Sequence, residues 1–589
     1  MGKVVTIAYD AVNAILHKPP VEAKLEVQSA LSYLVDGAEE TLAFRQHRWD
    51  GRSSFFDFAK CSFPAGFVVH VTDRLKKAGF EVKLARKPLP APLGPARPVV
   101  DSYGYDPRYD YQPEVMDRLV RHGQIIAQVA TGGGKSRIAM LCQARINRPT
   151  LFLTTRSILM YQMKDAFEAN GVACSVIGDG SFGQVNEKGQ LSIKKMTVGM
   201  VQTLAAKLEE TTLEKEFQIL YDNVVKKHEK EISDTKKQLI KVGKVESEIK
   251  KVLHNLALQH EKELQDKAPA MQAKAEAKFK EKSLVRQQTI KLLELFEFVI
   301  LEEAHEAGGN SYYEIMRHCK NAYYRLALTG TPFMRESQES NMRLMACSGP
   351  IAIKVTEKML IDRGILAKPY FKIVELKKKP AKLHSITPWQ AAYRLGIVQN
   401  EERNNAICME ILKAREYGMK AMVLVQHTSH GDTLLKLFDD IGIRARYIRG
   451  EDDQGERKSA LTELANKDID VLIGTTILDV GVDVPAVGLI ILAGGGKAEV
   501  ALRQRIGAGY VLRNSVQTLR LLLISQTSTI QRSNLTLDSV YRSSEKHPAL
   551  ARISLRISSL KSSVSKKLHS VLGLFNVLGK PVLFCGISA

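Results

Sequence analysis

The sequence predicts an α/β fold built on parallel sheets and interrupted by a long helical insertion. Residues 127–140, AQVATGGGKSRIAM, pass from an apolar run through three glycines into helical spacing, which indicates a strand, a loop and a helix. Apolar runs at 150–155 and 296–301 end in polar residues, as strands do at the ligand edge of an open α/β sheet. Residues 207–296 between them are rich in Lys, Glu and Gln and poor in glycine. At 589 residues the chain exceeds a single core, so several domains are expected.

The glycine-rich loop is a candidate phosphate site. Glycines let successive backbone N–H groups close around phosphate oxygens, and the helix that follows adds its dipole. We expect Lys135 to reach the β- and γ-phosphates of ATP and the Ser136 hydroxyl to ligate Mg²⁺. The expected ATP-binding residues of the loop are Thr131, Gly132, Gly133, Gly134, Lys135 and Ser136. Val129 stands where the strict pattern has glycine, so a glycine-rich turn of another α/β protein remains an alternative.

Charge and cysteine usage narrow the class of protein. Lys and Arg outnumber Asp and Glu by 85 to 64, which gives a net charge of +21 and indicates a polyanionic partner such as nucleic acid, although solvated surface charge explains it equally well. The seven cysteines form no CxxC pair and no zinc spacing, so we expect reduced, buried thiols in a cytoplasmic protein. No apolar run approaches the ~20 residues of a membrane span, so no membrane partner is expected.

The first 88 residues are expected to form a small DNA-binding-like domain. Two runs, VVTIAY and FVVHV, look β-like, and a helix is predicted over 71–78. A basic, Pro-rich stretch within 84–98 indicates a linker, placed at 89–100. Within the first domain, Trp49 is flanked in the sequence by four basic residues, Arg45, His47, Arg48 and Arg52. Interleaved basic and aromatic residues can hold phosphates and stack bases. A purely structural Trp49 in the core is slightly favoured.

Polar residues near the expected strand ends are candidates for ligand contact. Gln112 precedes the phosphate loop by about one helix, and its amide can read the adenine edge. Two later strands end in polar residues suited to sugar-phosphate contacts. These candidate nucleic-acid contacts are Thr155, Arg156, Gln202 and Thr203.

A pair of glutamates follows the next buried strand, FVIL. A strand tip in this position delivers carboxylates to a metal and a water molecule. We expect Glu302 to hold Mg²⁺, Glu303 to polarise the attacking water, and His305 to connect the site to the next segment. The strand after it ends at Thr329 and Thr331, whose hydroxyls can face the same site.

The insertion at 207–296 is predicted to be a helical, coiled-coil-like hairpin. Its apolar residues keep an a/d-like spacing, and Pro269 is expected to break the second helix. The spaced residues are Leu239, Val242, Ile249, Leu253 and Leu256. Arms of roughly 30 to 50 residues would reach on the order of 45 to 75 Å. A solvated spacer is as well supported as a lever that contacts DNA or protein.

These motifs, in this order, resemble those of superfamily 2 helicases. GGGKS, LEEAH and LTGTP resemble motifs I, II and III, and MVLVQHTSHGDTLLKLF, YIRGEDDQGERKSAL, DVLIGTTILDVGVDVPAVGLIIL and ALRQRIGAG resemble motifs IV to VI. The nearest group is that of the UvsW-like phage recombination helicases, related to the XPB-type translocases. The resemblance implies two tandem RecA-like domains, at 101–338 (with the insertion at 207–296) and 389–510, joined by a connector at 339–388.

The resemblance also assigns roles. Thr329 and Thr331 would couple hydrolysis to movement, and Glu302 stands where the family usually has aspartate. In the second domain, the implied nucleic-acid contacts are Gln426, Thr475 and Thr476. The implied ATP-binding residues of this domain are Gly481, Asp483 and Gln504, and Arg505 is an implied catalytic residue.

Motif VI departs from the family and the segment after it is unusual. Ala508 and Val511 occupy the positions of the two later arginines, which act as fingers on the transferring phosphoryl group. Residues 511–589 hold 15 serines and 11 Lys or Arg but two acids. A shifted reading frame after Gly507 would restore the arginines, so the tail is either out of frame or a true basic, Ser-rich tail.

Together these observations predict an ATP-dependent DNA helicase or translocase with ATP and Mg²⁺ as cofactors. Single-stranded or branched DNA is the expected partner, in recombination or repair, in the cytoplasm or in the host cytoplasm for a phage protein. An RNA helicase of the same superfamily and a hydrolysis-deficient DNA-binding remnant remain alternatives.

Overall fold

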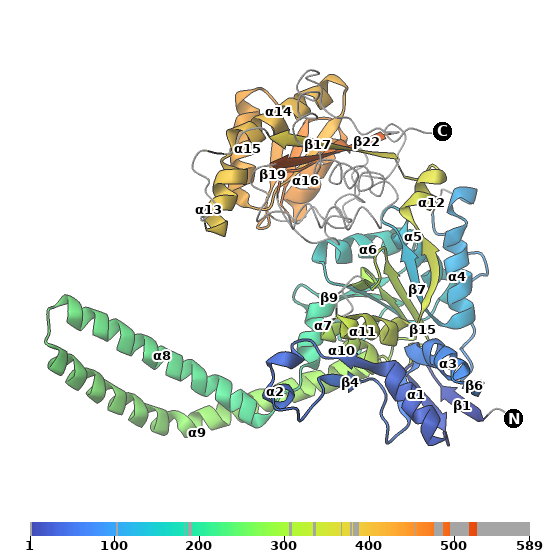
Figure 1. The fold of residues 1–589 in the computed structure, drawn as a ribbon, viewed down its shortest axis with the longest axis horizontal. Helices are drawn as coiled ribbons and strands as arrows, with labels where there is room; N and C mark the ends of the chain where they lie inside the picture. Colours follow the sequence, from blue (N-terminus) through green and yellow to red (C-terminus); the bar gives the residue numbers. More distant parts are fainter. Residues whose placement is uncertain are drawn as a thin grey trace, which may run out of the picture.

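The computed structural model describes residues 3–101, 104–182, 184–185, 191–305, 309–333, 337–366, 368–376, 380, 388–452, 454–475, 487–494 and 518–526. They form a small N-terminal domain, two α/β lobes and a long helical hairpin (Figure 1). We call residues 104–366 without the hairpin lobe 1, and residues 368–526 lobe 2. Each lobe has its own central sheet.

The N-terminal domain is a four-stranded sheet in the order β5-β2-β1-β6, packed against two helices. Its elements are β1 (Val4–Tyr9), β2 (Asn13–His17), α1 (Val21–Leu31), β3 (Ser32–Leu34), η1 (Ala38–Glu40), α2 (Leu42–Arg45), β4 (Arg52–Ser54), β5 (Ser62–Pro64), η2 (Ala65–Phe67), α3 (Val68–Lys77) and β6 (Glu81–Arg86). VVTIAY is strand β1, as predicted, but the prediction of a β-like run for FVVHV is wrong. Those residues lie in η2 and α3, because Val68, Val71 and Leu75 bury one face at helical spacing.

The N-terminal domain packs directly on lobe 1. The Phe55 ring meets Tyr313 of lobe 1 edge-on, with ring centroids 5.6 Å apart. Gly66 lies so close to lobe 1 that an added Cβ would stand 2.1 Å from the Met345 carbonyl oxygen. The first domain is therefore held against lobe 1 by close backbone packing.

Lobe 1 contains an eight-stranded sheet in the order β10-β9-β13-β8-β14-β15-β7-β16, parallel except for β10. Its elements are η3 (Pro107–Tyr109), α4 (Tyr111–His122), β7 (Gln124–Val129), α5 (Lys135–Ile146), β8 (Thr150–Thr154), α6 (Ser157–Ala169), β9 (Cys174–Gly178), β10 (Ser181–Phe182), β11 (Gln184–Val185), β12 (Leu191–Ser192), β13 (Met196–Met200), α7 (Val201–Leu208), β14 (Phe298–Leu301), α10 (Asn310–His318), β15 (Tyr324–Thr329), α11 (Gln338–Ser348), β16 (Ile351–Val355) and α12 (Glu357–Asp362). Because β7, β8, β13, β14 and β15 run parallel, their carboxyl ends meet at one edge of the sheet.

The hairpin leaves lobe 1 after α7 and returns to β14. It consists of α8 (Leu213–Lys241) and α9 (Glu246–Leu293), two antiparallel arms that project away from the lobe (Figure 1). The predicted break at Pro269 is wrong, since α9 continues through this exposed proline. Buried residues on both sides of it, His260 and Met271 among them, hold the helix together despite the missing N–H group.

A repeated tetrapeptide sets the register of the two arms. HEKE occurs at 228–231 in α8 and at 260–263 in α9. The two imidazoles stack with centroids 3.9 Å apart and planes 8° apart. His228 Nε2 lies 3.2 Å from Glu263 Oε2, and His260 Nε2 lies 3.3 Å from Glu231 Oε2. Of the predicted apolar stripe, Ile249 is buried whereas Val242 stands at the tip with 76% of its surface exposed.

Lobe 2 contains a six-stranded sheet in the order β17-β22-β21-β18-β20-β19, and all of its pairings are parallel. Its elements are β17 (Lys368–Leu376), α13 (Trp389–Tyr393), η5 (Arg394–Val398), α14 (Glu401–Glu416), β18 (Lys420–Leu424), α15 (Thr428–Asp440), β19 (Ala445–Ile448), α16 (Gln454–Ala465), β20 (Val471–Gly474), β21 (Val487–Leu492) and β22 (Thr518–Gln526). The two parallel-sheet lobes are tandem RecA-like domains, and the helical hairpin is an insertion in the first, as the sequence predicted.

Two segments lie elsewhere than expected. The stretch expected to be a connector, 339–388, supplies β16 to the first sheet and β17 to the second, because β16 pairs with β7 and β17 pairs with β22. Nine residues of the segment expected to be a tail form β22, between β17 and β21. Each sheet therefore extends beyond the expected border of its domain.

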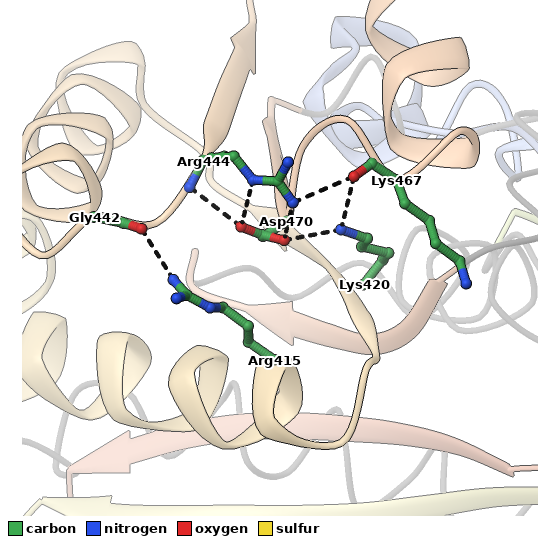
Figure 2. Close-up of polar contacts among 6 residues, drawn as sticks. All are labelled: Arg415, Lys420, Gly442, Arg444, Lys467 and Asp470. Atoms are coloured by element: carbon green, nitrogen blue, oxygen red, sulfur yellow. Dashed lines mark hydrogen bonds and ion pairs between the residues drawn. The ribbon is translucent and has the colours of Figure 1, made fainter.

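A buried ion cluster joins the amino ends of three strands in lobe 2 (Figure 2). Asp470 accepts hydrogen bonds from Lys420 Nζ at 2.8 Å and from Arg444 Nη2 at 2.9 Å. Both Asp470 and Lys420 are 7% exposed. This cluster lies at the edge of the sheet opposite to the carboxyl ends of the strands, so we assign it to stability.

Two further features of the described residues concern the cysteines and the helices. Six cysteines are free, and all of them except Cys61 are buried, while Cys585 lies outside the described residues. Among the helices that the structure describes, none combines the length and the apolar character needed to cross a lipid bilayer.

Candidate nucleotide and nucleic-acid site

The glycine-rich loop has the shape of a phosphate cradle. It joins the carboxyl end of β7 to the amino end of α5. Gly134 has φ of +76°, a left-handed conformation that favours glycine. At Gly133 an added Cβ would lie 2.6 Å from Val129 Cγ1, so a side chain would not fit. The loop therefore needs glycine at these positions, and its N–H groups can approach an anion closely.

Lys135 and the two glutamates that directly follow β14 meet beside this loop. Lys135 Nζ lies 3.5 Å from Glu303 Oε1, and both side chains are largely buried. Burial alone would lower the pKa of Lys135, but the charges of Glu303 and Glu302 outweigh it and raise that pKa. Burial would raise the pKa of Glu303, but Lys135 and a hydrogen bond to His305 lower it to about 2. Lys135 and Glu303 are therefore a charged pair at neutral pH.

Glu302 is suited to a divalent cation. Its side chain is 4% exposed, and Oε2 is buried with no hydrogen-bond partner among the described residues. Burial, opposed by Lys135 and reinforced by Glu303, raises the pKa of Glu302 to about 8. A buried, unpartnered carboxylate oxygen is stabilised by a hard cation, so the residues present fit Mg²⁺. Ser136, in the first turn of α5, is the other expected ligand.

A chain of polar contacts runs from Glu303 to the end of β15. His305 Nδ1 lies 3.2 Å from Glu303 Oε2 and 3.2 Å from Thr329 Oγ1. The Thr331 N–H donates to Thr329 Oγ1 at 3.2 Å. Glu303 itself has φ of +45°, an unusual conformation for a residue with a side chain. The structure thus brings together the carboxylate, His305 and both threonines predicted from sequence.

Gln112 contacts the phosphate loop from the amino end of α4. It is 1% exposed, and its Nε2 donates to the Gly133 carbonyl at 3.3 Å. Sequence reasoning missed two neighbours. The Tyr111 hydroxyl donates to the same carbonyl at 2.8 Å, and Arg137 Nη1 donates to Gln112 Oε1 at 2.6 Å. The only available signals were an aromatic residue beside the glutamine and a basic residue directly after Ser136.

The candidate nucleic-acid contacts of lobe 1 lie at the same sheet edge. Thr155 and Arg156 follow β8, and Gln202 and Thr203 begin α7, which follows the neighbouring strand β13. Gln202 Nε2 donates to the Thr155 carbonyl at 3.2 Å, so the two predicted pairs of residues are adjacent. The Gln202 side chain is exposed, so it could contact a sugar-phosphate backbone.

In lobe 2 two predicted residues lie at neighbouring strand ends. Gln426 is exposed after β18, and Thr475 is 8% exposed directly after β20, which pairs with β18. The remaining predicted residues of this lobe lie outside the described residues: Thr476, Gly481, Asp483, Gln504 and Arg505. Ala508 and Val511, where motif VI departs from the family, also lie outside them.

Family comparisons agree with this arrangement. Residues 106–334 match the model "Type III restriction enzyme, res subunit", and residues 402–508 match "Helicase conserved C-terminal domain". The chain belongs to the superfamily 2 helicases. The first match contains the glycine-rich loop and both glutamates, and the second contains β18 to β21 of the second sheet.

Individual relatives cover part of this helicase. "Putative helicase 22" of Sulfolobus islandicus filamentous virus is 24% identical over 223 residues, which is 36% of this chain and 39% of that protein. "Putative ATP-dependent helicase IRC3" of Saccharomyces cerevisiae is 26% identical over 228 residues, 37% of this chain and 32% of that protein. The chain thus matches about a third of the length of these relatives. The crystal structure of T4 UvsW is 16% identical with a TM-score of 0.40, covering 93% of this chain and 98% of that one.

Proposed function

We propose that this helicase hydrolyses ATP at the loop of lobe 1 and uses the energy to move along DNA, with branched or recombining DNA as its substrate. The observation that carries the catalytic part is the contact of Lys135 with Glu303 beside the unpartnered oxygen of Glu302. The preference for DNA and for branched structures rests on the sequence resemblance to UvsW-like helicases. Without the tail at 511–589 the net charge is still +12, which supports a polyanionic partner, whether DNA or RNA.

Each residue of the motor has a role that follows from its position. Mg²⁺ held by Ser136 and Glu302 would neutralise charge on the phosphates during transfer. Lys135 would leave Glu303 to bind the β- and γ-phosphates, which frees the Glu303 carboxylate to orient the attacking water and accept its proton. Because His305 bridges Glu303 and Thr329, a change at the carboxylate is transmitted to the end of β15.

The nucleic acid would lie across the sheet edge at Thr155, Arg156, Gln202 and Thr203, and on lobe 2 at Gln426, Thr475 and Thr476. Hydroxyl, amide and guanidinium groups contact sugar and phosphate rather than base edges. Binding is therefore expected to tolerate any sequence and to weaken steeply with salt. Opening and closing of the two lobes around ATP would step these contacts along the backbone.

A hydrolysis-deficient DNA-binding protein is the second candidate, favoured by Ala508 and Val511 in place of arginines. Arginine fingers contribute about 10³ to 10⁵ in rate, so their loss would leave binding without useful turnover. A single-base shift in the nucleotide sequence after the codon of Gly507 would remove this candidate by restoring the arginines.

ATP hydrolysis measured with no nucleic acid, single-stranded DNA, forked DNA and RNA tests the proposal. Forked DNA should stimulate hydrolysis most, and Lys135→Ala should abolish the stimulation. Lys320→Ala is the matched control, because Lys320 forms an exposed ion pair with Glu294 on the surface of lobe 1. Stimulation by RNA alone would overturn the DNA assignment, and DNA binding with a flat hydrolysis rate would favour the second candidate.

A further inference from the structure

The Gln112 amide lies inside a network that the proposed hydrolysis does not use. Arg137, in the first turn of α5, donates through Nη1 to Gln112 Oε1 at 2.6 Å. Its remaining nitrogens bind the Asp101 carboxylate and donate to the Gly104 carbonyl at 3.1 Å. The Arg137 and Asp101 side chains are 28% and 19% exposed, so the ion pair is well shielded from solvent.

This network fixes which way the amide faces. A guanidinium can only donate hydrogen bonds, so the amide atom against Arg137 must be the oxygen. The nitrogen then faces the Gly133 carbonyl, as the 3.3 Å contact shows. Since Tyr111 also donates to that carbonyl, at 2.8 Å, the loop holds the amide less strongly than the charged Arg137 does. Without Arg137 the amide could rotate.

The fixed orientation presents one donor and one acceptor to a base. Gln112 Oε1 keeps a second lone pair, and the second hydrogen of Nε2 is shared with the neutral Tyr111 hydroxyl, from which an acceptor on the base would take it. Adenine presents a donor amino group beside an acceptor nitrogen on one edge, and guanine presents two acceptors there. An amide held in one orientation therefore pairs with adenine and places oxygen against oxygen with guanine. A freely rotating amide would discriminate less.

We propose that Arg137, braced by Asp101, is the positioning residue that sets the preference of this site for adenine over guanine nucleotides. This inference deepens the proposed function and rests on the assignment of Gln112 to the base of ATP. The amide also packs closely against the phosphate loop: a Cβ added at Gly134 would lie 2.5 Å from Gln112 Nε2.

Equilibrium competition of ATP and GTP against a fluorescent ADP analogue tests the inference without requiring hydrolysis. Arg137→Gln should weaken ATP binding about ten-fold, the effect of a lost hydrogen bond to a charged group, and leave GTP binding unchanged. Asp101→Asn should shift the preference in the same direction by a smaller factor. In the double variant the two losses should be less than additive, because both act on one orientation.

Matched variants separate positioning from folding. Arg97→Gln removes an exposed arginine paired with Asp117 on the same lobe and should keep the full preference. Arg137→Lys keeps the charge but supplies a single donor point, so it should recover part of the preference. Asp101→Asn carries the test if Arg137→Gln does not fold.

Three outcomes would decide the matter. An unchanged ATP preference in Arg137→Gln, or equal losses for ATP and GTP, would overturn the inference. Failure of the unmodified protein to bind any adenine nucleotide would instead overturn the proposed function. A selective loss of ATP binding, with equal unfolding temperatures for the variant and the control, supports the inference.

Discussion

Replacing Asp470 with Asn should destabilise lobe 2 strongly while leaving nucleotide binding by lobe 1 intact. Asp470 binds Lys420 and Arg444 at the amino ends of the strands (Figure 2). The Lys420 side chain is 9% exposed, so losing its partner leaves an uncompensated buried ammonium, which costs about 3 to 5 kcal/mol. Arg444 is 59% exposed and adds at most about 1 kcal/mol. We expect the unfolding temperature of lobe 2 to fall by roughly 10 to 20 °C.

Urea unfolding of the full chain, followed by thermal unfolding, measures this loss. Asp468→Asn is the matched control, because it makes the same charge change at an exposed position two residues away. Lys420→Met together with Asp470→Leu should be far less harmful than Asp470→Asn, since it removes both buried charges. A loss below about 1 kcal/mol for Asp470→Asn, or equal losses for the two Asn variants, would refute the buried-pair reasoning.

The same cluster predicts a pH dependence. Burial would raise the pKa of Asp470, but hydrogen bonds from Arg444 and Lys420 outweigh burial and hold that pKa well below its usual value. The unfolded chain takes up the proton first, near pH 4, so the stabilisation is present at neutral pH and is lost as the pH falls below about 4. In Asp470→Asn the slope of stability against pH in this range should be smaller.

Two further predictions concern other sites. Gly134→Ala should weaken ATP binding at least ten-fold, because φ is +76° and the new Cβ would clash with the Gln112 side chain. Gly79→Ala controls for backbone strain alone, because Gly79 is also left-handed but has open space around it. Equal ATP binding by the two variants would contradict the prediction. Burial, together with the charges of Arg403 and His427, lowers the pKa of His430 to about 3, so lobe 2 should lose stability as the pH falls from about 6.5 toward 3. That loss should be absent in His430→Gln if the assignment is right.

The position of the candidate site on the first sheet could be predicted from sequence because its signals are local. GGGKS and LEEAH each occupy one strand end, and a parallel sheet brings such ends to one edge, where Lys135 Nζ lies 3.5 Å from Glu303 Oε1. Arg137, Asp101 and Tyr111 were missed because their role depends on contacts between separate segments. Arg137 reaches back 36 residues to Asp101, and no periodicity marks such a contact.

The errors have physical causes as well. FVVHV has the composition of a strand, but burial of Val68, Val71 and Leu75 on one face made it helical. Pro269 interrupts the local hydrogen bonding of α9, but packing against α8 outweighs that loss. The strand β22 was not expected because the segment around it was interpreted as a basic, Ser-rich tail, possibly out of frame.

The hairpin begins and ends at nearly the same place on lobe 1. Arg286 Nε of α9 donates to the Leu208 carbonyl of α7 at 3.0 Å, which ties the returning arm to the point of departure. Insertion or deletion of whole turns in both arms therefore leaves the sheet and its loops undisturbed. Each such turn moves the tip by about 5.4 Å. The distance that the hairpin spans can therefore change in evolution without altering the two lobes.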